Sequence, residues 1–572
     1  MFRNKSKKFW LVSVAIFFVL FFIHLFFSFN NNTLIALPDE LGYWGHARYL
    51  AGGYHPHFYN AAFYNFGYSL IIWPAFILFR ELNQIHQAAV LINNILMALI
   101  IFPTYYIVRH IYNCEIKLAL AIAFVVSLYP SFLAQTNFIM SENILIPAYL
   151  MLIVFLYQWL QKNSLFHLVL FSLDSVFLFA IHPRAVLMPA LVVTLLLILI
   201  FFKKISKRFF WIGLGTLVFS LGIVVLVNRH LAAVGWSTVN SFNLVKLIPT
   251  FFSGTGLLLF FSAIPGQLLY LLIGSFGLFA WGAYYLWKKI TDNYGRLSLR
   301  EILADNKKIA IAFVLFSSLL ILMISWVLPI FANANGSLRA DHIFYGRYNE
   351  GFVIFYLTAG LAALFDKSIK KSYHILWLFL LAWPVNYVYD LLNKLISVST
   401  FNIWAITPLF YLSGQKNIVL VAVFAAMITI ALRFSASHNF KVTFFILCTF
   451  FLSFAAVNRQ MLLEGRQRFY QAADFSTTRY LEKAGDIYQL SFDMSFNGKD
   501  QPNWATWYIS AYAYQYYLPQ IKFEQFYSSK ADIPKGPYVL SRPDWSQARA
   551  LKAEMVFQDD AIGQALWRLP VN

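Results

Sequence analysis

Long apolar stretches, separated by short polar segments, occupy the first 457 residues of the chain. A helix of about 20 apolar residues crosses the ~30 Å hydrocarbon core of a bilayer. Because lipid cannot satisfy backbone polar groups, only helices and closed barrels span it. The pattern therefore predicts a mainly α, polytopic membrane protein with about thirteen spans. The predicted spans are 9–29, 86–108, 117–136, 143–160, 165–181, 185–202, 209–227, 267–287, 309–331, 351–365, 373–389, 416–432 and 441–457.

Two further apolar stretches fit a crossing less well. Residues 67–79 are too short to cross and contain Pro74, so we predict a re-entrant or interfacial helix there. Residues 390–414 receive the same interpretation. The first run, 9–29, exceeds the ~7–15 residues of a signal-peptide core, so we interpret it as an uncleaved span.

Basic residues test this arrangement, because lysine and arginine collect in cytoplasmic loops. With a cytoplasmic N-terminus, nearly every basic cluster falls on the inner side. These clusters are Arg109 with Lys117, Lys162, the KKISKR run at 203–208, the lysines between Lys288 and Lys308, and DKSIKK at 366–371. The last span then leads to the outer face.

Residues 458–572 differ in composition from the chain before them. They alternate short polar and aromatic runs, with turn signals at 497–500 and 533–537 and a helical pattern near 476–484. We predict a transmembrane domain over 1–457 and a soluble extracytoplasmic α/β domain over 458–572. The aromatic segment 504–523 would form the core of that domain, or turn one or two rings toward the membrane site.

The charge balance argues against nucleic acid as a partner. The chain is 60% hydrophobic and 12% charged, with a net charge of +19. The tail after residue 457 carries 13 basic and 12 acidic residues, so the basic excess belongs to the membrane part. In the membrane part, the basic excess indicates which loops face the cytoplasm. The two cysteines, Cys114 and Cys448, indicate neither a disulfide framework nor a metal site.

Polar side chains with no evident structural role gather in the predicted outer loops. The first of these loops, residues 30–85, holds two adjacent carboxylates directly after the first span. Later outer loops add another carboxylate and several arginines. The candidates are Asp39, Glu40, Tyr43, His46, Arg48, Glu142, His182, Arg184, Tyr345, Arg347 and Tyr348.

Each candidate also has a structural interpretation. A proline before Asp39 and Glu40, and two glycines after them, are ordinary boundaries of a short helix with acids in its first turn. Glu142 would cap the span that follows it. Arg184 and Arg347 would anchor their segments at the membrane surface. Taken one at a time, the residues leave the choice open.

Their joint occurrence on one side favours chemistry. Asp39, Tyr43 and His46 share a helical face at i, i+4 and i+7. A carboxylate can deprotonate an acceptor hydroxyl, while arginines stabilise charge on a leaving phosphate. The inner side shows no glycine-rich phosphate loop or DxD motif. The pattern therefore favours transfer from a lipid-phosphate donor over transfer from a soluble nucleotide donor.

The chain resembles the lipid-carrier-dependent glycosyltransferases of the GT-C superfamily. The similarity is to the branch of the protein O-mannosyltransferases and the bacterial lipid A aminoarabinose transferase, over about the first 460 residues. The matching segments are PDELGYWGHARYLAGG at 38–53, GYSLIIWPAF at 67–76, MSEN at 140–143, HPRAVLMPAL at 182–191 and YGRYNEGFVIFY at 345–356.

The resemblance implies a role for each matching position. It implies a catalytic acid at Asp39 with Glu40 beside it, and a second acid at Glu142. Arg184, and Arg347 with Tyr348, would handle the lipid phosphate. The remaining candidates named above would contact substrate. Some members bind a divalent metal near the site; the sequence shows no clean ligand set and leaves a cofactor open.

These observations predict an inverting glycosyltransferase of the cytoplasmic membrane. It would move a sugar from a polyprenyl-phosphate donor to a glycan, lipid or protein acceptor on the outer face. A lipid-linked oligosaccharide flippase would be expected to show internal repeats or charged residues along several spans. A polysaccharide polymerase is chemically close to the favoured function. These two classes remain the alternatives.

Overall fold

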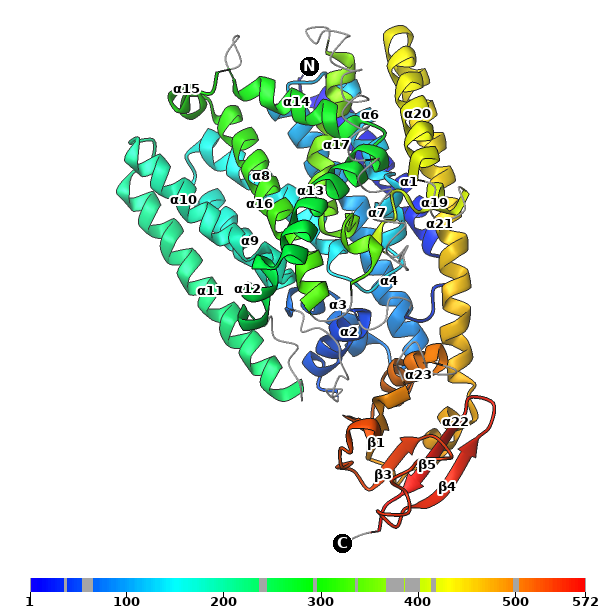
Figure 1. Cartoon of the computed structure of the whole chain (residues 1–572). Helices are drawn as coiled ribbons and strands as arrows, with labels where there is room; N and C mark the ends of the chain where they lie inside the picture. Colours follow the sequence, from blue (N-terminus) through cyan, green and yellow to red (C-terminus); the bar gives the residue numbers. More distant parts are fainter. Residues whose placement is uncertain are drawn as a thin grey trace.

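The computed structural model describes a tall bundle of helices with a small α/β domain at one end (Figure 1). The described residues are 2–34, 39–53, 65–235, 244–291, 296–334, 338–366, 385, 402–412, 418–496 and 504–570. The N-terminus lies at the end of the bundle opposite the α/β domain, and the C-terminus lies within that domain. The chain is a polytopic helical membrane protein, as the apolar pattern predicts.

Helices make up nearly all of the structure before residue 474. They are α1 (Phe2–Ser28), α2 (Asp39–Leu50), α3 (Gly67–Leu78), α4 (Leu82–Leu99), α5 (Ile101–Tyr106), η1 (Ile107–Ile111), α6 (Ile116–Ser127), α7 (Pro130–Gln135), α8 (Glu142–Lys162), α9 (Leu165–Ile181), η2 (Pro183–Ala185), α10 (Leu187–Phe201), α11 (Lys207–Gly235), α12 (Leu244–Phe252), α13 (Gly254–Gly274), α14 (Leu278–Ile290), α15 (Leu299–Ala304), α16 (Asn306–Ala334), η3 (Ala340–His342), η4 (Gly346–Tyr348), α17 (Glu350–Phe365), α19 (Thr407–Leu412), α20 (Ile418–His438) and α21 (Phe440–Ala473).

Within the described residues, nine helical segments are long and apolar enough to cross a membrane. Four shorter apolar helices accompany them: α3, α6, α9 and α17. Helix α3 is the predicted short helix at 67–79, and it packs on α2, α4 and α9. The predicted span 373–389 and most of the segment 390–414 lie outside the described residues.

Two predicted spans are divided in the structure. The stretch 117–136 forms α6 and α7, with the break before Pro130, because proline occupies the first turn of a helix more readily than its interior. The stretch 267–287 is divided between α13 and α14. There Phe276 and Gly277 take positive φ angles of 50° and 77°, which end one helix before the next begins.

Helix α21 extends well beyond its apolar part. The hydrophobic run ends near residue 457, yet the helix continues to Ala473 and carries the chain into the α/β domain (Figure 1). The remaining elements are α22 (Ser476–Lys483), β1 (Gln489–Asp493), η6 (Met494–Phe496), α23 (Trp504–Tyr517), β2 (Lys522–Phe526), η7 (Ser528–Lys530), β3 (Tyr538–Ser541), β4 (Glu554–Asp559) and β5 (Gln564–Arg568).

The five strands form one mixed sheet in the order β2-β1-β3-β5-β4. Strand β1 runs parallel to β2 and β3, with Leu490 level with Phe523 and Tyr538. Strand β5 runs antiparallel to both β3 and β4. The crossover from β1 to β2 contains α23, as parallel pairing requires. The turn predicted at 497–500 lies outside the described residues.

Helix α23 joins the α/β domain to the membrane bundle. The Tyr516 ring lies 5.1 Å from Trp44 of α2 and 6.0 Å from Phe469 of α21. Tyr517 stacks on Phe469 at 5.8 Å, and its hydroxyl lies 3.3 Å from Oγ1 of Thr33. Two rings of the aromatic segment therefore contact the bundle, and Tyr514 is buried within the domain.

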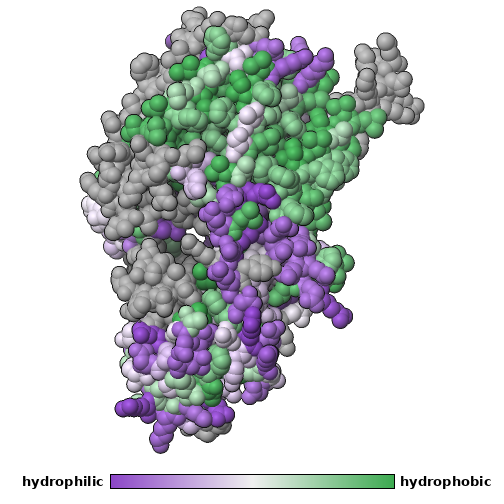
Figure 2. Space-filling view, turned by 90° about the vertical axis from the view of Figure 1, so that its right-hand side faces the viewer, coloured by the Kyte–Doolittle hydropathy of each residue, from purple (hydrophilic) through white to green (hydrophobic). Residues whose placement is uncertain are grey.

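The surface follows the same division. Figure 2 shows hydrophobic residues gathered over the upper part of one face and hydrophilic residues over the lower part, where the α/β domain lies. Large apolar side chains on α1, α11 and α20 are exposed, among them Phe22, Phe219 and Phe434. Their exposure suits contact with lipid tails.

Candidate active site

Four segments that are distant in the sequence meet at one polar cluster. Asp39 begins α2, Glu142 begins α8, Arg184 lies in the turn η2 after α9, and Arg347 lies in η4 before α17. Carboxylates suit the first turn of a helix because of its unpaired N–H groups and dipole. The two arginines, in contrast, lie in short turns between helices.

Arg347 is the centre of this cluster, because it contacts both carboxylates. Its Nη1 lies 2.6 Å from Oδ2 of Asp39, and its Nε lies 2.9 Å from Oε1 of Glu142. The Glu142 side chain is 1% exposed, whereas that of Asp39 is 23% exposed. One carboxylate is therefore sealed in the protein, and the other is accessible.

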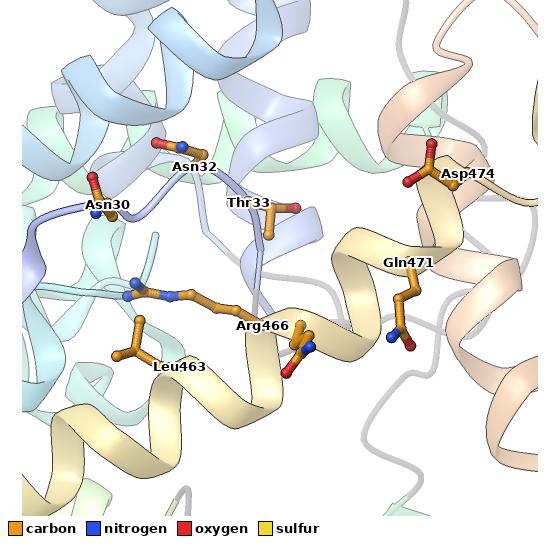
Figure 3. Close-up of a pocket in the computed structure, with 8 residues that line it drawn as sticks. Asn30, Asn32, Thr33, Leu463, Arg466, Gln471 and Asp474 are labelled. Atoms are coloured by element: carbon orange, nitrogen blue, oxygen red, sulfur yellow. The ribbon is translucent and has the colours of Figure 1, made fainter.

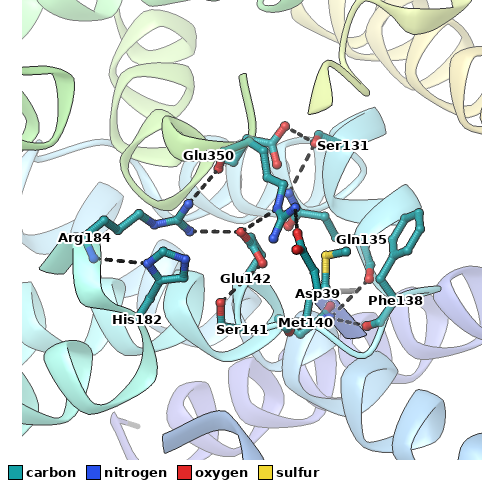
Figure 4. Close-up of polar contacts among 12 residues, drawn as sticks. Asp39, Ser131, Gln135, Phe138, Met140, Ser141, Glu142, His182, Arg184 and Glu350 are labelled. Atoms are coloured by element: carbon teal, nitrogen blue, oxygen red, sulfur yellow. Dashed lines mark hydrogen bonds and ion pairs between the residues drawn. The ribbon is translucent and has the colours of Figure 1, made fainter. Parts of the chain in front are cut away.

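Arg184 also contacts Glu142 (Figure 4). Its Nη2 lies 3.2 Å from Oε1 of Glu142, and its Nη1 donates to the Arg347 carbonyl at 3.3 Å. Its guanidinium also lies 5.2 Å from the centre of the Tyr348 ring. Glu142 thus binds two guanidinium groups at once and fixes the distance between them.

His182 shapes the turn that presents Arg184. Its Nδ1 accepts a hydrogen bond of 3.1 Å from the Arg184 backbone N–H. Burial, together with the neighbouring arginines, holds the pKa of His182 well below its usual range. A neutral imidazole is required for this acceptor role. His182 therefore supports the loop and adds no positive charge to the cluster.

A cavity of about 670 Å³ opens beside the cluster. This size lies within the range of small-molecule sites. Its polar wall consists of Asp39, His182, Arg184, Tyr345, Arg347 and Tyr348. Its apolar wall consists of Phe179, Pro183, Val186, Ile324, Val327, Leu328 and Phe331. The cavity is thus charged on one side and hydrocarbon-like on the other.

The two tyrosines of the polar wall remain neutral. Burial raises the pKa of both Tyr345 and Tyr348. The two rings meet edge to face with centroids 4.9 Å apart. Neutral phenols donate hydrogen bonds, so they can serve anionic or hydroxyl-rich ligands.

Glu40 takes a different direction from its neighbour. It is fully buried, and its Oε1 accepts a 2.7 Å hydrogen bond from the backbone N–H of Ile139. That residue belongs to the loop leading into Glu142. The structure therefore places Glu40 under the site, where it supports the loop, and Asp39 alone of the acidic pair lines the cavity.

The other candidates on α2 are close to the cluster but covered. Tyr43, His46 and Arg48 are buried, and none is among the described residues that line the cavity. Tyr43 packs edge to face on Tyr68 at 5.2 Å. Burial raises its pKa strongly, and Glu142 adds to that shift. The three side chains therefore lie in the protein interior, and Tyr43 packs α2 against α3.

Two features of the site lie outside the residues to which the sequence analysis assigned a role. One is the apolar wall on α16, where Ile324, Val327, Leu328 and Phe331 follow the i, i+3, i+4, i+7 spacing of one helical face. Apolar residues occur all round this helix, so the spacing does not distinguish the face that lines the cavity from the other faces. The other is Glu350, which is buried and accepts a 2.8 Å hydrogen bond from the Tyr270 hydroxyl.

The described residues contain no group of three or more His, Cys, Asp or Glu side chains that could hold a metal ion. Asn349 closes the turn that carries Arg347, because its backbone N–H donates to the Gly346 carbonyl at 2.8 Å.

No known protein family and no curated protein matches the sequence. Solved structures do match the fold. The apo structure of ArnT from Cupriavidus metallidurans aligns over 98% of both chains with a TM-score of 0.50 and 14% identity. ArnT bound to undecaprenyl phosphate aligns over 99% of this chain and 98% of its own, with a TM-score of 0.50 and 12% identity. The shared fold confirms the predicted polytopic helical membrane protein with a C-terminal domain.

Proposed function

We propose that this protein is an integral-membrane glycosyltransferase that uses a polyprenyl-phosphate-linked sugar donor and an acceptor outside the cytoplasmic membrane. One observation supports the proposal above all others. An accessible carboxylate, Asp39, stands beside two buried guanidinium groups at a cavity that is polar on one wall and apolar on the other. The ArnT fold, and the undecaprenyl phosphate bound in one ArnT structure, agree with it.

The donor phosphate would bind between Arg184 and Arg347. Both guanidinium groups line the cavity, and Glu142 holds them in fixed positions. The planar guanidinium matches phosphate oxygens with parallel N–H donors. Tyr345 and Tyr348 add neutral hydrogen-bond donors on the same wall. The lipid chain of the donor would lie against the apolar face of α16.

Asp39 would act as the general base. Its carboxylate takes the proton of the acceptor hydroxyl while the hydroxyl oxygen attacks the anomeric carbon. The bond between that carbon and the donor phosphate breaks, and its electron pair goes to the phosphate oxygen. The arginines stabilise the charge that develops there. Attack opposite the leaving phosphate inverts the anomeric centre.

The α/β domain would cover the site and select the acceptor. Helix α23 supports this role because Tyr516 packs on Trp44 of α2, and α2 carries Asp39 at its start. The basic loops favour a cytoplasmic N-terminus, which would put Asp39 and the α/β domain on the outer side. We place the division between the two parts near residue 457, inside the continuous helix α21.

Purified full-length protein supplied with synthetic polyprenyl-phosphate sugars tests the function directly. We expect sugar release from the lipid, and a fall of at least ~10²-fold in turnover for Asp39→Asn, which keeps the shape and removes the base. Asp560→Asn, an exposed carboxylate of the α/β domain, is the matched control. Transport of the intact lipid-linked sugar without cleavage would instead identify a flippase. Full activity of Asp39→Asn would reject the assigned base.

A further inference from the structure

A second, smaller cavity lies between the end of α1 and the polar extension of α21. Its volume is about 360 Å³. Figure 3 shows the first loop after α1 on one side and α21 on the other. The lining residues are Asn30, Asn32, Thr33, Leu463, Arg466, Gln467, Gln471 and Asp474. None of them lines the Arg184–Arg347 cavity, so the two sites are separate.

Arg466 is the exceptional member of this lining. The residue is only 6% exposed, and its side chain runs from α21 toward Asn30 (Figure 3). Its Nη2 donates to Oδ1 of Asn137 at 2.6 Å, while its buried Nε has no hydrogen-bond partner. Among the described residues, no carboxylate lies within ion-pair distance of it. A buried cation in this state calls for an anion.

The other lining groups suit a phosphate-bearing headgroup. Amide side chains at Asn30, Asn32, Gln467 and Gln471 offer both donors and acceptors for hydroxyl groups. The carboxylate of Asp474 is already paired with Arg479 at 2.8 Å. The buried Glu40 carboxylate acts on Arg466 from beyond ion-pair distance, so an anion in the cavity meets a guanidinium that no direct ion pair neutralises, next to neutral amide groups.

The position of the cavity indicates a ligand held in the membrane. Phe26 and Phe29 at the end of α1 are each 60% exposed, as lipid-facing residues are, and Asn30 follows them directly. On α21, the Arg459 guanidinium lies 5.1 Å from the centre of the Phe26 ring. Arg459 precedes Arg466 by seven residues, which is about two turns along the same face of the helix. The cavity thus begins where the lipid-facing surface ends, at the level of headgroups.

We propose that this cavity binds the phosphate-bearing headgroup of an anionic membrane lipid, with Arg466 as the phosphate ligand. The planar guanidinium donates to the phosphate oxygens, and the amides of the lining bind the remaining polar atoms of the headgroup. The proposal is independent of the transferase function, because it concerns binding alone. The proposed lipid site is linked to the candidate active site, because Arg466 binds Asn137 and Asn137 precedes the loop that ends at Glu142.

Native mass spectrometry of the full chain in detergent tests the proposal by counting bound lipids. The probes are phosphatidic acid, phosphatidylcholine and inorganic phosphate. We expect wild type to carry one more phosphatidic acid than Arg466→Gln, and Arg549→Gln, an exposed arginine, to match wild type. Phosphatidylcholine should not fill the site, and inorganic phosphate at the same concentration should not displace the lipid.

Gln471→Trp is a second variant that fills the cavity from an exposed position and leaves Arg466 intact. It should lose the same single lipid, and it decides the matter if Arg466→Gln does not fold. Equal lipid counts in wild type and either folded variant would overturn the proposal. Displacement by inorganic phosphate would overturn its lipid part and leave a site for free phosphate.

Discussion

The polar cluster of the candidate active site and the surface of the α/β domain use the same residue types in opposite settings. In the cluster, two arginines and two carboxylates share three contacts of 2.6–3.2 Å, with side chains 1–23% exposed. On the domain, Arg479 with Asp474 and Arg542 with Asp544 form pairs of 2.8 and 3.1 Å, with side chains 35–73% exposed. The distances are alike, and the burial is not.

Burial changes what an ion pair does. Removing charges from water costs several kcal/mol per ion, and mutual attraction offsets this cost only in part. Exposed pairs avoid the cost and contribute about 0–1 kcal/mol. A cluster that is expensive to bury is thus poorly explained by stability alone. Its cavity and the accessible Asp39 supply a functional reason for it.

The largest effect on stability is expected at the centre of the cluster. Glu142→Gln removes the carboxylate shared by Arg184 and Arg347 and leaves two buried cations short of a partner. We expect a loss of about 3–5 kcal/mol in the free energy of unfolding. Unfolding of the purified protein in detergent measures it, with the exposed Glu482→Gln as control. Equal stability of the two variants would mean that the cluster is not sealed from water.

Next in size is the contact between the two parts of the molecule. Tyr516→Ala removes a buried ring that packs on Trp44 and Phe469. Truncating a buried aromatic residue lowers the free energy of unfolding by about 3–5 kcal/mol. Part of that loss weakens the contact between the α/β domain and the membrane bundle. We expect less acceptor glycosylation relative to donor hydrolysis, with the exposed Tyr488→Ala as control. An unchanged ratio would remove the α/β domain from acceptor selection.

A smaller effect is expected when the charge is kept and only its geometry changes. Arg347→Lys and Arg184→Lys each retain a cation but lose the planar donors of the guanidinium. Charged hydrogen bonds contribute about 1.5–3 kcal/mol, so kcat/KM should fall roughly 10- to 100-fold in each variant. Donor-binding measurements should weaken in parallel. If both variants bind the donor and react normally, the arginines do not bind the phosphate. They would then only anchor their segments at the membrane surface.

The smallest effect belongs to the exposed pairs. Arg479→Gln breaks the contact with Asp474 on the α/β domain. We expect the free energy of unfolding to change by less than about 1 kcal/mol, and donor hydrolysis to stay at the wild-type rate. A loss as large as that of Glu142→Gln would contradict the distinction drawn from burial.

Much of the fold follows from local pattern. The period and length of apolar runs predict α9 at its observed bounds, and α17 and α20 to within a few residues. The division at Phe276 and Gly277 was missed because hydrophobicity does not report backbone angles. The polar end of α21 was missed because a helix past the membrane no longer needs apolar residues.

By itself, the sequence determined the class of the molecule, and it named the charged residues that the structure brings together around Glu142. The length of a span follows from the thickness of the bilayer, and the excess of lysine and arginine in some loops follows from topology. Both can be recognised from short stretches of sequence. Only the tertiary structure decided how the candidates divide their roles. Asp39 and Glu40 are adjacent in sequence, yet one lines the cavity and the other supports the loop before Glu142. Successive residues of a helix point in different directions, and what each meets depends on segments far away in the chain.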